Sequence, residues 1–251
     1  MEGAAPESAA GEPRSERSRG EKGGVMTLWE LKGRDGRRYS MFSWRTKMAL
    51  KHKGLDYESK PVLMSDKAAI AFSGGKTVPI IKDGETVVRD SWQIAEYLED
   101  RYPERPTLFG GAIGRGMAQA FNTWADRTLL PLLMPVIVAD LYERIDPGDE
   151  QFFRQQFEGF LKSTLEEARG RRDEFAKRLE RQVEPWQAVL KRQRFVCGAS
   201  PAYGDYILFS LFQWARIASP HELVAAGSPL DAWRSRMLDL YDGFARNVLT
   251  A

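Results

Sequence analysis

The spacing of apolar residues changes once along the chain, near residue 104. Before this point, short apolar runs alternate with two amphipathic segments, which predicts the order strand, helix, strand, hairpin and helix. After it, apolar residues recur every three or four positions, which predicts helices alone. The expected strands are 25–31, 57–63, 77–81 and 85–88, and the expected later helices are 112–145, 150–183, 203–218 and 229–246.

Turn and capping residues set the limits of the first elements. Gly54 ends the helix that follows Ser40, and Asp83 and Gly84 supply the tight turn of the hairpin. Asp90 begins the next helix, which stops before Pro103. We therefore expect an α/β domain over residues 25–103, a linker over 104–111 and an all-α domain over 112–251.

Residues 1–24 precede this pattern and differ from it. They contain five acidic and four basic residues among Pro, Gly, Ser and Ala, and beyond Met1 no large apolar side chain. Such a segment has neither the apolar core of a signal peptide nor anything to bury, so we expect a disordered tail. Met26 stands before the first strand, and the functional product could begin there.

Composition excludes several kinds of chemistry. One cysteine and two histidines leave no disulfide framework and no Cys/His zinc cluster, so we expect no metal. A net charge of +2 from 37 basic and 35 acidic residues gives no reason to expect nucleic acid or a membrane as partner. No apolar run approaches the roughly 20 residues that cross a bilayer. We expect a cytoplasmic protein that acts on a small molecule.

The segment Ser40-Met41-Phe42-Ser43 lies where the first strand has ended and the first helix begins. In a thioredoxin-like fold, this position carries the two redox cysteines of a C-x-x-C motif. The two serines cannot perform disulfide exchange. Their hydroxyl groups can, however, bind the thiol of another molecule.

Val78-Pro79 precedes a buried strand, where a proline cannot donate to the ladder of backbone hydrogen bonds. In thioredoxin-like folds this peptide bond is cis, which turns the backbone of the preceding residue toward the active site. A bound peptide could then pair with Val78 as an extra strand. An ordinary edge-strand proline is the alternative.

A serine at the first helix start, Val-Pro before a hairpin and Asp90-Ser91 at the next helix start together resemble the glutathione-binding signature of cytosolic glutathione S-transferases. The likeness spans Met26 to about Arg246. It is greatest to the bacterial β-aryl etherases and their fungal etherase-like relatives, through the segments 44–54, 90–103 and 239–243. The segment 43–45 also resembles the zeta-class isomerases. The family implies a thioredoxin-like domain followed by a helical domain, glutathione as co-substrate and a homodimer.

This resemblance assigns Ser40 as the catalytic residue, whose hydroxyl donates to the sulfur of glutathione. Amides at the helix start would add partial positive charge that favours the thiolate. A plain helix cap is the alternative role for Ser40, and Ser43 or Tyr39 could donate to the thiol in its place. Met41 stands where the etherases commonly have proline.

Other positions are implied to bind the two substrates. Asp90 and Ser91 form an anion site for the γ-glutamyl carboxylate, and Asp90 faces its ammonium group. Lys76 or Arg38 would pair with the glycyl carboxylate, and Val78 and Pro79 would face the peptide. We expect the pocket for the electrophile to be lined by apolar and aromatic side chains of Met41, Phe42, Trp124, Leu129, Leu132 and Leu133.

Three functions follow from this reading of the sequence. The first is a glutathione transferase with β-etherase-type activity, in which the thiolate displaces a phenolate from an aryl ether. The second is a zeta-type cis-trans isomerase, which Met41 and Phe42 disfavour. The third is a binding module without catalysis. Ala202 replaces the Ser or Thr usual three residues before Asp205, which we still expect to cap its own helix.

Overall fold

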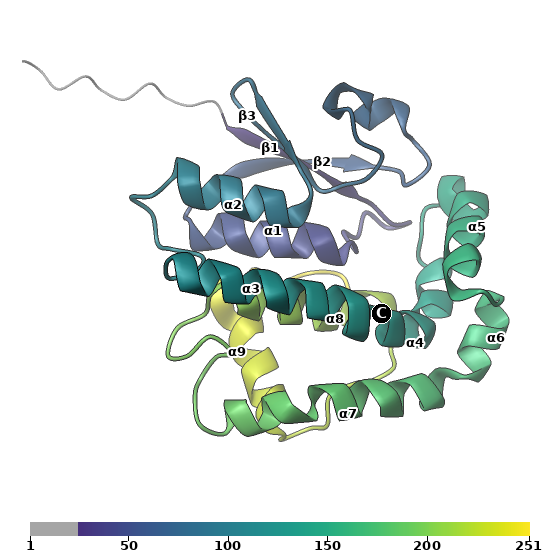
Figure 1. The fold of residues 1–251 in the computed structure, drawn as a ribbon. Coiled ribbons are helices and arrows are strands. Elements are labelled where there is room, and N and C mark those ends of the chain that lie inside the picture. Colours follow the sequence, from purple (N-terminus) through teal and green to yellow (C-terminus); the bar gives the residue numbers. More distant parts are fainter. Residues whose placement is uncertain (1–24) are drawn as a thin grey trace, which may run out of the picture.

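The computed structural model describes residues 25–251, and the expectations for residues 1–24 lie outside this described part of the chain. The first half is a four-stranded sheet with helices on the side that faces the second, helical half (Figure 1). This arrangement confirms the predicted fold class. Among the helices of the described residues, none is both long and apolar enough to span a membrane.

The sheet has the strand order β2-β1-β3-β4, with only the β1–β2 pair parallel. Its strands are β1 (Met26–Leu31), β2 (Tyr57–Val62), β3 (Ile80–Asp83) and β4 (Thr86–Arg89). The crossover between the parallel strands is α1 (Met41–His52), and α2 (Ser91–Arg101) follows the hairpin. A 3₁₀ helix, η1 (Ala68–Ser73), lies between β2 and β3.

The helical half begins with α3 (Ala112–Trp124), which passes through a π-helical turn, η2 (Ala125–Leu129), into α4 (Leu130–Tyr142). A 3₁₀ turn, η3 (Pro147–Asp149), leads into α5 (Glu150–Leu161). The remaining helices are α6 (Leu165–Gly170), α7 (Arg172–Leu190), α8 (Tyr203–Ala218) and α9 (Pro229–Gly243). In Figure 1, α5, α6 and α7 curve around the outside of this half.

The single helix expected over 150–183 is wrong, because the chain folds into three helices there. Lys162 ends α5 with a left-handed φ of 55°. Thr164 then begins α6 through a capping box: its Oγ1 accepts from the Glu167 amide at 3.1 Å, and Glu167 accepts from the Thr164 amide at 2.9 Å. The third helix, α7, continues to Leu190.

Buried charged groups join the two halves. Arg45 of α1 is fully buried, and its guanidinium donates to Asp126 at 2.7 Å and to Asn122 at 2.7 Å. Arg37, in the loop before α1, donates to the Ile217 carbonyl at 2.9 Å at the far end of α8. A buried guanidinium with several acceptors fixes relative orientation. These contacts hold α1 against the helical half.

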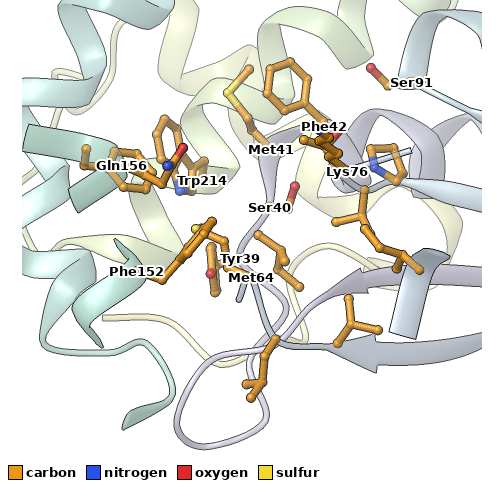
Figure 2. A pocket seen from close by; sticks show the side chains of 18 of the residues that line it. Tyr39, Ser40, Met41, Phe42, Met64, Lys76, Ser91, Phe152, Gln156 and Trp214 are labelled. Atoms are coloured by element: carbon orange, nitrogen blue, oxygen red, sulfur yellow. The ribbon is translucent and has the colours of Figure 1, made fainter. Parts of the chain in front are cut away.

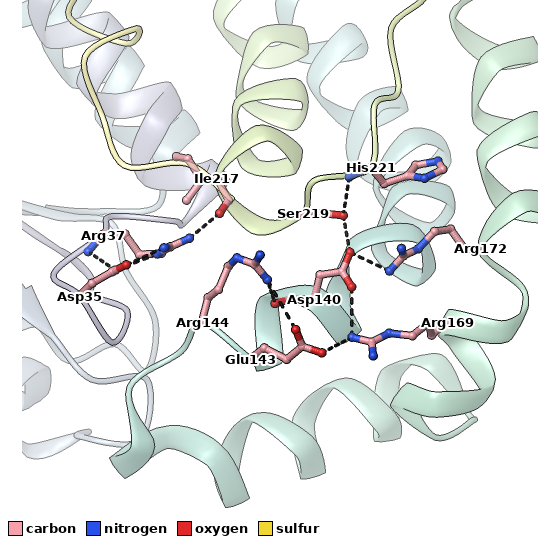
Figure 3. Close-up of polar contacts among 10 residues, drawn as sticks. All are labelled: Asp35, Arg37, Asp140, Glu143, Arg144, Arg169, Arg172, Ile217, Ser219 and His221. Atoms are coloured by element: carbon pink, nitrogen blue, oxygen red, sulfur yellow. Dashed lines mark hydrogen bonds and ion pairs between the residues drawn. The ribbon is translucent and has the colours of Figure 1, made fainter.

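A second cluster surrounds Asp140 of α4 inside the helical half (Figure 3). Its carboxylate contacts Arg172 at 2.7 Å and Arg169 at 3.1 Å, and it accepts a hydrogen bond from the Ser219 hydroxyl. Burial opposes ionisation of Asp140, yet the Ser219 hydroxyl and the Arg172 guanidinium hold its pKa below the usual value. The cluster ties α4 to α6, α7 and the end of α8.

Candidate active site

A cavity of about 740 Å³ lies between the sheet half and the helical half. It is within the range of volumes that small-molecule sites occupy. Eight of the residues expected to bind substrates line it: Ser40, Met41, Phe42, Lys76, Val78, Pro79, Asp90 and Ser91. Trp124, Leu129, Leu132 and Leu133, which were also expected there, do not. The structure thus brings together positions from three separate segments of the sheet half.

Ser40 is the N-cap of α1 and lies on the cavity wall, 8% exposed. Its Oγ accepts from the Ser43 amide at 3.4 Å, and among the described residues its hydroxyl proton is donated to no partner. The first amides of α1 add the partial positive charge of a helix N-terminus. Ser40 can therefore cap the helix and donate a hydrogen bond into the cavity at once.

Ser43 and Arg38, which the sequence offered as alternatives, point elsewhere. Ser43 is fully buried and is not part of the cavity wall. Arg38 lies 3.8 Å from Glu30, a carboxylate that is 1% exposed and forms a buried ion pair with Lys47 at 2.9 Å. Burial lowers the pKa of Lys47. This group stabilises the sheet rather than the cavity.

The peptide bond between Val78 and Pro79 is cis, as expected for a thioredoxin-like fold. The strand expected from residue 77 begins later, at Ile80, so Val78 lies before β3 and at the cavity. Within the described part of the chain, the amide and carbonyl of Val78 make no hydrogen bond. Both groups remain available to an extended peptide.

Asp90 and Ser91 form the start of α2 on the same wall. One oxygen of Asp90 accepts from the amides of Trp92 at 2.9 Å and Gln93 at 3.2 Å. Asp90 has a φ of 68°, a conformation that side-chain-bearing residues rarely adopt and that concentrates at functional sites. Tyr203 of α8 donates to the Ser91 carbonyl at 2.8 Å, which fixes this turn from the helical half.

Two lysines provide positive charge at the cavity. Lys76 is exposed and lies in the loop before Val78. The Lys67 ammonium donates to the Lys76 carbonyl at 3.0 Å and lies 4.7 Å from the centre of the Phe152 ring. Burial lowers the pKa of Lys67. Both lysines thus lie at the cavity beside the chain that leads into β3.

The opposite end of the cavity is apolar, although the helical residues that line it differ from those expected. Trp124 stacks on Phe121, with ring centres 5.5 Å apart, and Leu129 and Leu133 are core residues. The π-helical turn at 125–129 rotates the face of the helix that follows it. The helical half contributes instead Leu130, Met134, Phe152, Gln156, Phe157, Phe160 and Trp214.

Two polar side chains at this end are buried without partners. Tyr39 is 2% exposed and Trp214 is 5% exposed, and within residues 25–251 neither the Tyr39 hydroxyl nor the Trp214 indole nitrogen has a hydrogen-bond partner. Figure 2 shows both on the same side of the cavity as Phe152 and Gln156, with Ser40 between them and Ser91. Burial, then the charges of Asp149 and Asp146, raise the pKa of Tyr39 well above its usual value.

Asp149 connects the two sides of this apolar end. It is fully buried at the start of α5 and accepts from the amides of Met64 at 2.7 Å and Ser65 at 2.8 Å. The Ser65 hydroxyl donates to the same carboxylate at 2.6 Å. Met64 follows β2, so one side chain holds α5 and its aromatic residues against the edge of the sheet half.

Known proteins resemble both halves of the chain. Residues 39–101 match the model of the glutathione S-transferase N-terminal domain, and residues 116–236 match that of the C-terminal domain. A crystal structure of the glutathione transferase GSTFuA3 from Phanerochaete chrysosporium superposes with a TM-score of 0.70 at 26% identity, covering 87% of this chain and 92% of that one.

Curated relatives match shorter stretches. Glutathione S-transferase Z2 of Arabidopsis thaliana is 44% identical over 69 residues, which are 26% of this chain and 31% of that protein. The zeta-class glutathione S-transferase of Euphorbia esula is 31% identical over 121 residues, 45% of this chain and 54% of that protein. The chain thus spans between about a third and a half of these relatives, and they do not support the etherase subfamily. The two domain models represent successive parts of one kind of protein, and the chain belongs to the glutathione S-transferase family.

Proposed function

We propose that this protein is a glutathione transferase in which Ser40 activates the glutathione thiol for attack on a hydrophobic aromatic electrophile. One observation carries the proposal: a hydroxyl with an undonated proton stands at the N-terminus of α1 on the wall of a large cavity. The polar residues of the sheet half lie on one side of it. The aromatic residues of the helical half lie on the other.

The electrostatics of this position favour a thiolate. A free thiol titrates near pH 8.5, and each unit by which its pKa falls corresponds to about 1.4 kcal/mol of preference for the charged form. A hydrogen bond from Ser40 and the free amides of α1 both stabilise negative charge on sulfur. Together they supply the one or two units that would make the thiolate abundant at neutral pH.

The peptide part of glutathione suits the groups on the sheet side. The unpaired amide and carbonyl of Val78 can bond to the backbone of its cysteinyl residue. Asp90 and the amides that begin α2 can meet the γ-glutamyl ammonium and carboxylate. Lys76 can meet the glycyl carboxylate. Val78, Asp90 and Lys76 thus match the cysteinyl, γ-glutamyl and glycyl parts of glutathione, respectively.

For the electrophile we propose an aryl ether, cleaved at the carbon that bears the aryloxy group. The thiolate supplies the electron pair of the new carbon–sulfur bond, and the phenolate departs with the pair of the broken carbon–oxygen bond. Solvent then protonates the phenolate, so no oxidant or reductant is needed. The wide apolar and aromatic lining beside Ser40 supports planar substrates of this kind.

A second candidate is cis-trans isomerisation of the zeta type, favoured by the similarity to the zeta-class protein of Euphorbia esula. It would use the same thiolate for reversible addition. A non-catalytic binding module is the third candidate. Turnover of glutathione with 1-chloro-2,4-dinitrobenzene, an α-keto aryl ether and maleylacetone separates all three, because the binding module turns over none of them.

We further propose a homodimer. Support comes from α3, where Ile113 and Met117 are one turn apart and are 86% and 67% exposed. Exposed apolar pairs of this kind are common at interfaces. Sedimentation analysis would measure a mass near twice that of the chain, and Ile113→Lys with Met117→Lys should return it to the monomer.

The substitution Ser40→Ala tests the proposed chemistry. Loss of one preorganised donor should lower kcat/KM by about 10-fold to 10³-fold with every accepted electrophile, while the affinity for glutathione hardly changes. The absorbance of the bound thiolate should titrate at higher pH. Ser43→Ala is the matched control, since Ser43 is buried away from the cavity, and it should leave turnover unchanged.

Two results would contradict the assignment. If Ser40→Ala retains full activity and Tyr39→Phe loses it, Tyr39 is the thiol partner and the transferase function survives. If neither variant affects turnover of an accepted electrophile, side-chain activation of the thiol is excluded and the amides of α1 act alone.

A further inference from the structure

Lys67 contacts both sides of the cavity and has no part in the chemistry of Ser40. Its ammonium group donates to the Lys76 carbonyl at 3.0 Å and lies 4.7 Å from the centre of the Phe152 ring. Lys76 belongs to the sheet half and Phe152 to α5, and all three residues line the cavity. An ammonium group has three donors, so it can bond to a carbonyl and face a ring at once. One side chain therefore connects the glutathione side to the helical half.

The helical half also contacts the backbone that carries this side chain. Asp149, at the start of α5, accepts from the amides of Met64 and Ser65. The Lys67 amide donates to the Ser65 carbonyl at 2.9 Å. Phe152 follows Asp149 by about one turn of helix. The start of α5 thus holds Lys67 at both ends, through Asp149 near its backbone and through Phe152 at its ammonium group.

The segment 76–78 depends on this contact. Within the described part of the chain, the bond from Lys67 is the only hydrogen bond that the backbone of these three residues makes. Gly74, with a φ of 67°, and Gly75 precede the segment, and glycine restricts the backbone least. The free amide and carbonyl of Val78 belong to this segment. Their position is therefore set by β3 on one side and by Lys67 on the other.

We propose that Lys67 is a positioning residue for glutathione, which fixes the segment 76–78 where Val78 can pair with the bound peptide. Lys67 acts through the Lys76 carbonyl and does not contact glutathione itself. The inference rests on the proposed function, because that function makes Val78 part of the glutathione site. It adds that α5, a helix of the electrophile side, contributes to the affinity for glutathione.

Lys67→Met tests this role, since methionine keeps an unbranched side chain and lacks the ammonium group. Calorimetry should show the Kd for glutathione rising about three- to tenfold, the range of one net hydrogen bond. Lys67→Arg can donate to the same carbonyl and face the same ring, so it should return the Kd to within about twofold of the wild-type value.

Lys60→Met is the matched control. Lys60 also lies over an aromatic ring, 5.4 Å from the centre of Trp29, but it is not part of the cavity wall. The Kd for glutathione should not change in this variant. An equal loss of affinity in Lys60→Met and Lys67→Met would reduce the effect to the loss of any surface charge and overturn the proposal.

A modified ligand separates positioning from direct contact. Glutathione amidated at its glycyl carboxylate keeps the peptide and loses the terminal charge. If Lys67 positions Val78, Lys67→Met should weaken glutathione and this amide by the same factor. If the substitution weakens glutathione alone, Lys67 binds the glycyl carboxylate directly, and the proposal is overturned.

Turnover separates positioning from a general loss of structure. At saturating glutathione, Lys67→Met should keep kcat with 1-chloro-2,4-dinitrobenzene within about twofold, because Ser40 and α1 are unchanged, while KM for glutathione rises with Kd. An unchanged Kd would overturn the proposal. A fall in kcat together with a lower melting temperature would also overturn it.

The outcomes for the two proposals are distinguishable. If the Kd values for glutathione and its amide both depend on Lys67 while the electrophile panel shows no turnover, the positioning role stands and the transferase function fails. If turnover depends on Ser40 while the Kd for glutathione is the same in Lys67→Met, the function stands and the positioning role fails.

Discussion

Two buried regions of this protein each contain a tyrosine and a tryptophan. In one region the polar atoms of these side chains make hydrogen bonds, and in the other they make none. Where α8 begins, Tyr203 donates to the Ser91 carbonyl at 2.8 Å and Trp233 donates to Asp205 at 2.9 Å. At the cavity, Tyr39 and Trp214 donate to no other described residue. The same fold therefore satisfies such donors where they only support structure. At the cavity, the two donors stay without a partner in the described part of the chain.

The region where α8 begins should lose the most stability when its hydrogen-bond acceptor is removed. Asp205 is fully buried and accepts from Trp233 and from the amides of Val196, Cys197 and Ala202. Asp205→Ala leaves these four donors unpaired, and we expect it to lower the free energy of unfolding by about 3–5 kcal/mol. Urea denaturation would measure the loss.

Asp231→Ala is the control for that experiment, because Asp231 also accepts near a helix start but is partly exposed. We expect it to cost about 1 kcal/mol or less. Equal losses in the two variants would show that the region where α8 begins is no more critical than an ordinary cap.

The glutathione side should lose affinity rather than stability. Asp90→Ala removes the charge-assisted contact proposed with the γ-glutamyl ammonium group, and we expect the Kd for glutathione to rise about tenfold, equivalent to about 1.4 kcal/mol. Asp90→Asn keeps an oxygen for the amides of Trp92 and Gln93, and it suits the positive φ. Calorimetry should therefore show the loss in both variants. Recovery in Asp90→Asn would mean that the cap, and not the charge, binds glutathione.

Two tyrosines can be compared directly, and one of the two substitutions should have no destabilising effect at all. Tyr203→Phe breaks a made hydrogen bond and leaves the Ser91 carbonyl unpaired, which should cost about 1–2 kcal/mol of stability. Tyr39→Phe removes a hydroxyl that has no partner, so thermal unfolding should show no loss and even a gain. If Tyr39→Phe is as destabilising as Tyr203→Phe, the contrast between the two regions is false.

Local patterns in the sequence were sufficient to predict which residues of the sheet half lie at the cavity. The S-x-x-S segment, Val-Pro and Asp-Ser each lie at an element boundary, and a thioredoxin-like order of elements brings such boundaries to one edge of the sheet. This is why Ser40, Val78 and Asp90 meet at the cavity as expected. Their roles in binding and catalysis stay predictions.

The helical half could not be placed in the same way, because helical periodicity shows which residues share a face and not what the face meets. Trp124 was assigned to the electrophile pocket, but its ring packs against Phe121 and against Trp186 of α7. Phe152, Gln156 and Phe160 recur at four-residue spacing on α5, a signal visible in the sequence. To use this spacing, the sequence analysis would have had to end the helix at Lys162. The T-x-x-E pattern that begins at Thr164 is a helix-start signal and could have indicated that end.

The role of Asp149 in joining α5 to the chain after β2 has a consequence for what the cavity can accept. Because one carboxylate holds both rims, the width of the apolar end is fixed before any substrate arrives, and a bulkier molecule cannot enter by pushing α5 outward without breaking three hydrogen bonds. After burial, the charge of the same carboxylate helps to raise the pKa of Tyr39, so it disfavours a negative charge at this position. The size and the charge of the molecules that the apolar end accepts therefore both depend on Asp149. A family member with another residue at this position would differ in both.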